Sequence, residues 1–515
     1  MDTIAQLLHG FAIALTPGNL LAVLLGAVIG TVIGVLPGLG PTATLALLLP
    51  ITIGMDMVTA LIMMAGIYYG AMYGGSITSI LVNIPGEAAS VVTCIDGYQM
   101  ARQGRAGPAL GMSAFGSFIG GTVSVVVLML ISPFLAEAAL KFGAPEMFAL
   151  LFFAFTCIGG LTGKSRSQGL LMACVGLLLG TIGTDDIQGV DRFTFGTLYL
   201  QDGIGLVPLA MGIFGLGEIL YNIEQREDQG AILATPKSLL PTALDWKRSA
   251  KPIARGSLLG FGIGIIPGGM PAVASLMSYA LEKRVARRPE EFGHGAIEGV
   301  AGPETANNAA TAGGFVPLLT LGIPTNSVLA LMLAAMMLHG VTPGPLLLIK
   351  WPDVFWGVVA SMYIGNVMLI ILNVPLIGLF VQLLRVPYGI LSPLIIMFVL
   401  LGAYALKNSV SDLVTTILFG LMGYLMKRFG VEPAPLILAF VLGPMLENNL
   451  SKALIMSRTG NPLFFFTRPI AASLLTLAIL VLLCPLVRGG WRYAAARIGA
   501  QRGGRETSTG AAGNG

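Results

Sequence analysis

The stretch GAVIGTVIGVLPGLGP at residues 26–41 returns later in the chain as GSLLGFGIGIIPGGMP at residues 256–271. The two stretches align without gaps and are identical at seven of their sixteen positions. A shorter match follows in the same order, between residues 74–85 and 313–324. Interrupted apolar segments at corresponding places in two halves are typical of secondary transporters that bind their substrate near the bilayer midplane. The repeat therefore predicts two related halves around a transport site.

Both copies of the first block contain a Pro-Gly break and then a second proline, which suits the first turn of a new helix. The unpaired N–H groups and positive dipole end of such a helix form an anion site without a charged side chain. Irregular backbone at this depth is tolerated only where protein or a watery cavity covers it. The alternative is a pair of kinked structural helices. The predicted substrate-binding residues at the first breaks are Pro37, Gly38, Gly40, Pro41, Thr42, Pro267, Gly268, Gly269 and Pro271.

The second blocks, LVNIPGEAAS at residues 81–90 and LGIPTNSV at residues 321–328, again place a proline break beside small polar residues. Their amides and hydroxyls offer hydrogen-bond donors and acceptors inside lipid. Polar contacts that only pack membrane helices together are the alternative. The predicted substrate-binding residues here are Asn83, Pro85, Gly86, Pro324, Thr325, Asn326 and Ser327.

Residues 302–314, GPETANNAATAGG, place four polar side chains on one helical face at three- and four-residue spacing. Polar side chains on a membrane helix usually face a cavity or pathway. Asn and Thr oxygens suit a hard cation such as sodium, whereas the glutamate suits a proton. An ordinary interfacial helix start is the alternative. The predicted coupling-ion residues are Glu304, Asn307, Asn308 and Thr311, and apart from a transported sodium ion no metal or cofactor is expected.

The composition is that of a membrane protein. Of 515 residues, 55% are hydrophobic and 10% charged, against about 25% charged in a soluble domain, and the mean hydropathy is +0.84. Long apolar runs recur along the chain. They predict an all-α polytopic protein of roughly 10–12 transmembrane helices. We expect two inverted repeats with re-entrant or broken helices, of which the hairpin at residues 257–281 enters from the cytoplasm.

Basic residues gather in short segments between the apolar runs, which the positive-inside rule places in the cytoplasm. They form no face or stripe, so a nucleic-acid partner is not expected. Lysine and arginine are almost absent from the apolar runs, so no charge-paired substrate pocket is expected either. The acidic segment at residues 185–202 is expected outside.

The expected organisation follows from these boundaries. It comprises a membrane-entry segment (1–18), the first repeat (19–107), connecting scaffold helices (108–222), a cytoplasmic loop (223–255), the second repeat (256–345), C-terminal scaffold helices (346–487) and a disordered basic cytoplasmic tail (488–515).

At these motifs the chain resembles the large membrane subunit of the tripartite tricarboxylate transporters. The resemblance rests on GVLPGLGPTAT (34–44), GGSITSILVNIPGEAAS (74–90), DGYQMARQGRAG (96–107) and PETANNAATAGGFVPLLTLGIP (303–324). It implies a multi-pass protein of the bacterial inner membrane with two partners, a small four-helix membrane subunit and a periplasmic solute-binding protein that delivers a carboxylate. It also implies that an ion gradient drives uptake without ATP. Thr325 stands where the family usually has glycine, so the substrate could differ from citrate.

Other classes of protein fit less well. An ion-coupled transporter of organic anions that acts without a binding protein is the nearest alternative. A membrane-embedded enzyme would need an acid, base or metal cluster within the membrane, and the sequence shows none beyond Glu304. A channel would more naturally carry a filter motif than a two-fold internal repeat.

Overall fold

The structure is a computed structural model. It describes residues 3–36, 40–161, 166–185, 187–225, 239–383, 388–457 and 461–483. Their regular secondary structure is helical, apart from one hairpin of two-residue strands, β1 (Gly183–Thr184) and β2 (Asp191–Arg192), which pair antiparallel. The all-helical fold predicted from composition is therefore confirmed.

Within this described part, seven helical segments are long and apolar enough to cross a membrane. They are α2 (Pro17–Val35), α4 (Met57–Val82), α6 (Ala106–Ala139), the segment Leu206–Gln225 with α10 (Leu206–Ala210) and α11 (Gly217–Gln225), α18 (Pro352–Asn373), α20 (Tyr388–Lys407) and α21 (Val410–Arg428). The other helices of the described part are shorter or less apolar, so the expected total of roughly 10–12 spans remains a prediction.

The described part contains further elements. They are α1 (Thr3–Ala14), α3 (Pro41–Thr52), η1 (Ala88–Ser90), α5 (Val91–Arg102), α7 (Ala144–Leu161), α8 (Arg166–Gly180), α9 (Leu198–Gln201), η2 (Met211–Leu216), α12 (Ala243–Ile265), α13 (Pro271–Val285), η3 (Pro289–Glu291), α14 (Glu298–Gly313), α15 (Phe315–Leu321), α16 (Ser327–Leu338), α17 (Leu347–Lys350), α19 (Ile377–Leu383), α22 (Ala434–Met456), η4 (Pro462–Thr467) and a last helix, Pro469–Leu483.

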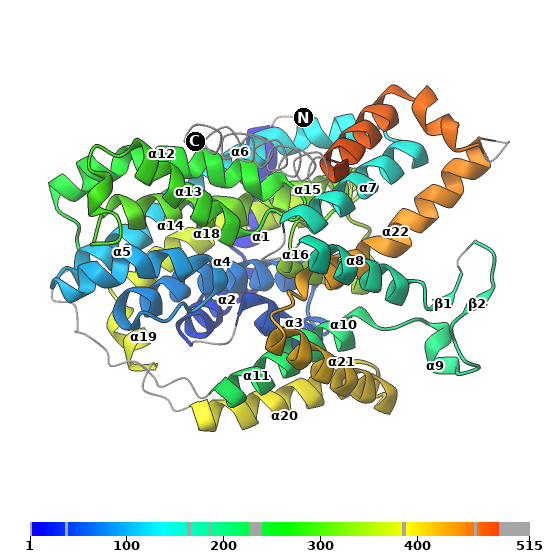
Figure 1. Cartoon of the computed structure of the whole chain (residues 1–515), viewed down its shortest axis with the longest axis horizontal. Coiled ribbons are helices and arrows are strands. Elements are labelled where there is room, and N and C mark those ends of the chain that lie inside the picture. The colour runs from blue at the N-terminus through cyan, green and yellow to red at the C-terminus, as the bar shows by residue number, and fades with distance from the viewer. Residues whose placement is uncertain are drawn as a thin grey trace, which may run out of the picture.

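Helices α2 and α4 lie in the middle of the molecule, whereas α20 and α21 run along one edge (Figure 1). Helix α4 is buried along almost its whole length, and most of α20 is exposed. The exposed side chains of α20 and α21 are largely apolar, which suits contact with lipid tails. The strands β1 and β2, with α9, project from the end of the body beside α8 and α22 (Figure 1).

Glycines of the repeated block bring two helices into backbone contact in the first half. A Cβ atom added to Gly30 of α2 would lie 2.3 Å from the Ile67 carbonyl oxygen of α4, and one added to Gly34 would lie 2.4 Å from that of Ala71. Any larger side chain at these positions would separate the helices. Small residues at a membrane helix interface permit such close packing.

The matching glycines of the second half have the same function. A Cβ atom on Gly260 of α12 would lie 2.2 Å from the Ala306 carbonyl oxygen of α14, and one on Gly264 would lie 2.3 Å from that of Ala310. Matched positions of the repeat therefore make matched helix contacts. The inversion of one half relative to the other remains a prediction.

The second breaks also correspond. Helix α4 ends at Asn83 with a left-handed φ of 61°, and α15 ends at Gly322 with a φ of 72°. Both residues are C-caps, and each stands two positions before the proline of its break. Asn and Gly are the residues that adopt this conformation at least cost, and they end helices for that reason.

Helix α12 begins earlier than the apolar pattern suggested. It starts at Ala243, where Thr242 and Asp245 form a capping box. The last part of the predicted cytoplasmic loop 223–255 is therefore helical, and residues 226–238 of that loop lie outside the described part. The expected disordered tail, 488–515, also lies outside it.

Ion pairs hold this helical extension against the body. The guanidinium of Arg105 lies 2.5 Å from a carboxylate oxygen of Asp245, and that of Arg248 lies 2.7 Å from one of Glu298 on α14. From the sequence, these arginines were interpreted as topology signals exposed to solvent. Their acidic partners lie far away along the chain, so no local pattern indicated the ion pairs.

Candidate functional site

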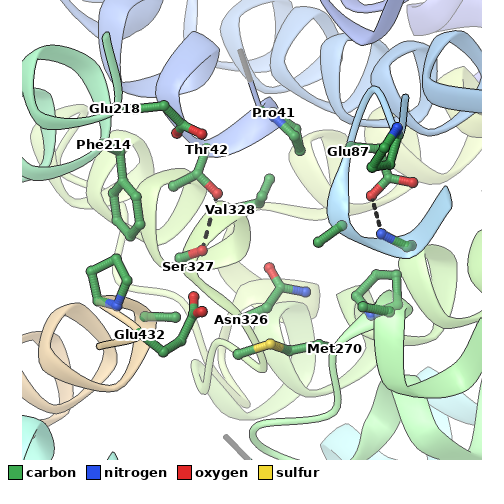
Figure 2. Close-up of a pocket in the computed structure, with 18 of the residues that line it drawn as sticks. Pro41, Thr42, Glu87, Phe214, Glu218, Met270, Asn326, Ser327, Val328 and Glu432 are labelled. Atoms are coloured by element: carbon green, nitrogen blue, oxygen red, sulfur yellow. Dashed lines mark hydrogen bonds between the residues drawn. The ribbon is translucent and has the colours of Figure 1, made fainter. Parts of the chain in front are cut away.

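A cavity of about 520 Å³ lies between the two halves, a volume typical of small-molecule sites. Its walls come from the breaks of both halves and from the segment between α21 and α22. Eight of the residues predicted from the sequence line it, namely Gly40, Pro41, Thr42, Pro85, Gly86, Pro271, Asn326 and Ser327. Figure 2 shows Pro41, Thr42, Asn326 and Ser327 around this space.

Three helices of the breaks begin at the cavity. Pro41 is the first residue of α3, Pro271 is the first residue of α13, and Ser327 is the first residue of α16. The first N–H groups of a helix have no partner within it, and the helix dipole adds positive potential there. Three such ends at one cavity form an environment that favours a negatively charged ligand.

Side-chain hydrogen bonds connect the two halves at this point. The hydroxyl oxygens of Thr42 and Ser327 lie 3.0 Å apart, as Figure 2 shows. The Asn326 side chain caps α16 by accepting the Leu329 N–H at 3.0 Å, and its amide donates to the Tyr68 hydroxyl at 3.0 Å. The polar wall is thus positioned by residues of α3, α4 and α16 together.

Other predicted residues do not line the cavity. Asn83 caps α4, and Pro267, Gly269, Pro324 and Thr325 are not part of the cavity wall. Pro37 and Gly38 lie outside the described residues.

Gly268 is not a lining residue either, and it adopts a left-handed φ of +80°. Its N–H donates to the Thr325 carbonyl oxygen at 2.9 Å, which joins the two breaks of the second half. The neighbouring Gly269 N–H donates to Ile266 at 2.7 Å. These two amides already have acceptors, so the anion-binding character of the cavity comes from the helix starts.

An ion pair that was not expected from the sequence forms part of the lining. The Lys427 ammonium at the end of α21 lies 2.5 Å from a Glu218 carboxylate oxygen of α11, and both residues line the cavity. The expectation that no charge-paired pocket exists was therefore wrong. Lys427 stands beside Arg428 at a helix end, where a basic pair reads as a topology signal.

Two further carboxyl groups open onto the cavity, Glu87 after the second break and Glu432 before α22 (Figure 2). Glu432 lies outside the seven long apolar segments. Desolvation raises the pKa of its carboxyl above the usual value, although nearby Lys427 opposes the shift. The acidic part of the wall has no repeat signature, so no pattern in the sequence indicated these carboxyl groups.

The four predicted coupling-ion residues are fully buried in α14 and do not line the cavity. The Glu304 carboxylate accepts hydrogen bonds from the Ser76 hydroxyl at 2.6 Å and from the Thr93 hydroxyl. The Thr311 hydroxyl donates to the Asn307 carbonyl oxygen at 3.0 Å. Within the described ranges, no group of three or more His, Cys, Asp or Glu side chains is arranged to hold a metal ion.

A multi-pass helical protein with a polar cavity at paired helix breaks has the architecture of a membrane transporter. The family comparison agrees with this class. The chain belongs to the tripartite tricarboxylate transporter TctA family, whose model matches residues 20–438. It is therefore a transport protein and not an enzyme.

Two relatives come from Agrobacterium vitis. An uncharacterized 52.8 kDa protein of the TAR-I ttuC' 3' region is 50% identical over 491 residues, which are 95% of this chain and 98% of the relative. An uncharacterized protein of the TAR-II ttuC' 3' region is 52% identical over 232 residues, which are 45% of this chain and 94% of the relative. No solved structure matches the chain.

Proposed function

We propose that the chain is the large permease subunit of a binding-protein-dependent secondary transporter of the bacterial inner membrane. It imports tricarboxylates or related small organic acids, and a sodium or proton gradient drives the uptake. Its partners are a small four-helix membrane subunit and a periplasmic solute-binding protein. Membership of a tripartite family supports this assignment.

The observation that carries the proposal is the meeting of three helix N-termini, those of α3, α13 and α16, at one cavity with the Lys427 ammonium in its wall. Helix ends contribute about 0.3 to 2 kcal/mol each toward a bound anion. Several together hold a carboxylate while still allowing its release. The substrate-binding residues we propose are those of the breaks that line the cavity, together with Lys427.

A paired replacement on α3 tests the site. Thr42→Val removes a hydroxyl that faces the cavity, and we expect a loss of substrate affinity with normal amounts of folded protein. Thr52→Val is the matched control, because its hydroxyl donates to the Leu49 carbonyl oxygen at the far end of the same helix. Equal effects of the two variants on substrate binding would place the site elsewhere.

The energy source is tested by reconstitution with both partners in vesicles. Imposed sodium and proton gradients should each be applied alone, with citrate and other small carboxylates as substrates. Uptake that persists on ATP with both gradients collapsed contradicts secondary transport. Uptake that is unchanged without the binding protein supports the alternative of an independent organic-anion transporter.

We further propose that the repeats are inverted and that the segment from α12 to α13 is a re-entrant hairpin from the cytoplasm. Matched glycine contacts and matched left-handed caps support the repeat itself. In a cysteine-free background, single cysteines at Gly189 and Arg287 should react with impermeant reagents from opposite sides. Reaction of both from the periplasm contradicts the inversion.

A further inference from the structure

Glu87 has a buried carboxyl group, and only one of its two oxygens accepts a hydrogen bond within the described residues. One carboxylate oxygen accepts the Ala89 N–H at 2.6 Å, which caps η1 (Figure 2). The other oxygen, Oε1, has no hydrogen-bond partner among the described residues. The side chain is 8% exposed and lines the cavity. A desolvated carboxylate with an unused oxygen is costly unless another group neutralises it.

The protein itself makes room for this carboxyl group. Glu87 packs against Gly75 of α4, where an added Cβ atom would lie 2.7 Å from the Glu87 Cγ. Gly75 is one of the glycines repeated between the halves. Its absent side chain allows the carboxylate to sit in the wall between the cavity and α14.

On the side away from the cavity, the Asn307 side chain of α14 approaches Glu87 without completing a hydrogen bond. Asn307 is fully buried, and both its amide oxygen and its amide nitrogen lack partners within the described residues. Orphaned polar atoms at this depth call for an ion or a water molecule. The other titratable groups that face Glu87 are Glu304 of α14 and Tyr68 of α4.

We propose that the Glu87 carboxylate and the Asn307 amide oxygen hold the coupling cation, a sodium ion, in the wall of the substrate cavity. The inference rests on the proposed function, because it assumes an ion-driven carboxylate transporter. Carboxylate and amide oxygens are ligands that hard cations prefer. Water molecules supply the remaining ligands.

This placement accounts for coupling by charge. The cavity wall carries Lys427 paired with Glu218, so the Glu87 charge is left without a cationic partner there. An ionised Glu87 repels an anionic substrate, and the same site attracts the substrate once a cation is bound there. Cation and substrate therefore raise each other's affinity, as thermodynamic linkage requires.

The test is sodium binding to the purified, detergent-solubilised protein. Ligand binding to the folded state raises the unfolding temperature as the ligand concentration exceeds its Kd. We expect sodium chloride to raise the unfolding temperature of the wild type, while potassium and choline chloride at equal ionic strength do not. Glu87→Gln and Asn307→Leu should weaken the sodium response by at least about tenfold in Kd, since each removes one ligand.

Controls separate a lost ligand from a damaged fold. Glu290→Gln removes an exposed carboxylate outside the cavity and should leave the sodium response intact. Glu87→Asp keeps the charge on a shorter side chain, and a weakened but measurable response is expected from it. If Glu87→Gln does not fold, the Asn307→Leu and Glu87→Asp variants decide the question.

Three results would overturn the inference. A sodium response that survives in Glu87→Gln but is lost in Glu304→Gln moves the cation to Glu304. A wild type that responds to pH but never to sodium makes the coupling ion a proton. A sodium response that is unchanged in Asn307→Leu removes the amide from the site. In all three cases gradient-driven uptake by the wild type would still stand, so the proposed function is judged separately.

Discussion

The carboxylate of Asp96 and the hydroxyl of Tyr279 share a hydrogen bond of 2.9 Å, which joins α5 of the first half to α13 of the second. The other Asp96 oxygen accepts the backbone N–H groups of Gly293, Gly295 and Ala296 at 2.8 to 2.9 Å. Asp96 is fully buried. One side chain therefore fixes both a helix and the segment before α14.

Replacement of this carboxylate should destabilise the protein strongly. Asp96→Ala leaves several donors without an acceptor, and each buried unsatisfied group costs about 1 to 3 kcal/mol. We expect a loss of about 2 to 4 kcal/mol in the free energy of unfolding, and about 1 kcal/mol for Tyr279→Phe. Denaturant unfolding in detergent measures both. Strictly additive effects in the double variant would show that the two residues do not interact.

Glycines that look alike in the sequence should differ in their tolerance. Gly30→Ala places a Cβ atom 2.3 Å from the Ile67 carbonyl oxygen, and the forced separation of α2 from α4 should cost about 1 to 3 kcal/mol. At Gly262 of α12 no atom lies within 4 Å of an added Cβ, so alanine there should stabilise the helix by up to about 1 kcal/mol. Thermal unfolding of the two variants side by side checks this order, and the reverse order would contradict the close packing.

The neighbouring residues Lys427 and Arg428 should differ in their effect on substrate binding. Lys427 lines the cavity, whereas Arg428 pairs with Glu224 outside the lining. A charged hydrogen bond is worth about 1.5 to 3 kcal/mol, so Lys427→Gln should weaken binding by about ten- to a hundredfold. Arg428→Gln should change it little. Binding of labelled carboxylate to the purified protein measures both.

A double variant separates two causes of such a loss. Lys427→Gln also leaves Glu218 without its ion-pair partner, and that unpaired carboxylate would repel an anion by itself. If the double variant Lys427→Gln and Glu218→Gln binds as the wild type does, the ammonium is not a ligand of the substrate.

The pairing of Asp245 should make stability depend on pH. Burial raises the pKa of the Asp245 carboxyl, but hydrogen bonds from Thr242 and Arg105 outweigh it and hold the pKa below the usual value. A lowered folded-state pKa gives stability above the unfolded pKa of about 3.9 that is lost as the pH falls through the folded value. The difference in unfolding midpoint between wild type and Asp245→Asn should thus be full at pH 7 and shrink below about pH 4. A difference independent of pH would contradict the assignment.

The helix starts at the cavity were predictable because proline is a local signal. The sequence predicts new helices at Pro41, at Pro271 and at the polar residues 325–327. In the structure, α3, α13 and α16 begin there. The repeat then indicated that these starts belong together. Helix-start signals and the internal repeat were enough to predict eight of the residues that line the cavity.

The charged part of the site required tertiary contacts. Lys427 and Glu218 are 209 positions apart, and no pattern along the chain relates them. Glu87 caps η1 only because the chain turns after α4. Its Oε1 lacks a partner among the described residues because of how α14 packs against this turn. Such features follow from packing between helices, which spacing within one segment does not encode.

The hydrogen bond from the Gly268 N–H to the Thr325 carbonyl oxygen belongs to no side chain. Alanine scanning removes only side-chain atoms, so it would leave this donor and acceptor in place. It would therefore not measure how much the bond contributes to stability or transport. Replacing Gly268 does not test the bond either. Because its φ is +80°, any new side chain would strain the backbone, and the measured effect would come from that strain and not from the hydrogen bond. Semisynthesis with glycolic acid at position 268, which replaces the amide by an ester, deletes the donor alone. Main-chain chemistry, and not side-chain replacement, therefore reports on the connection between the two breaks.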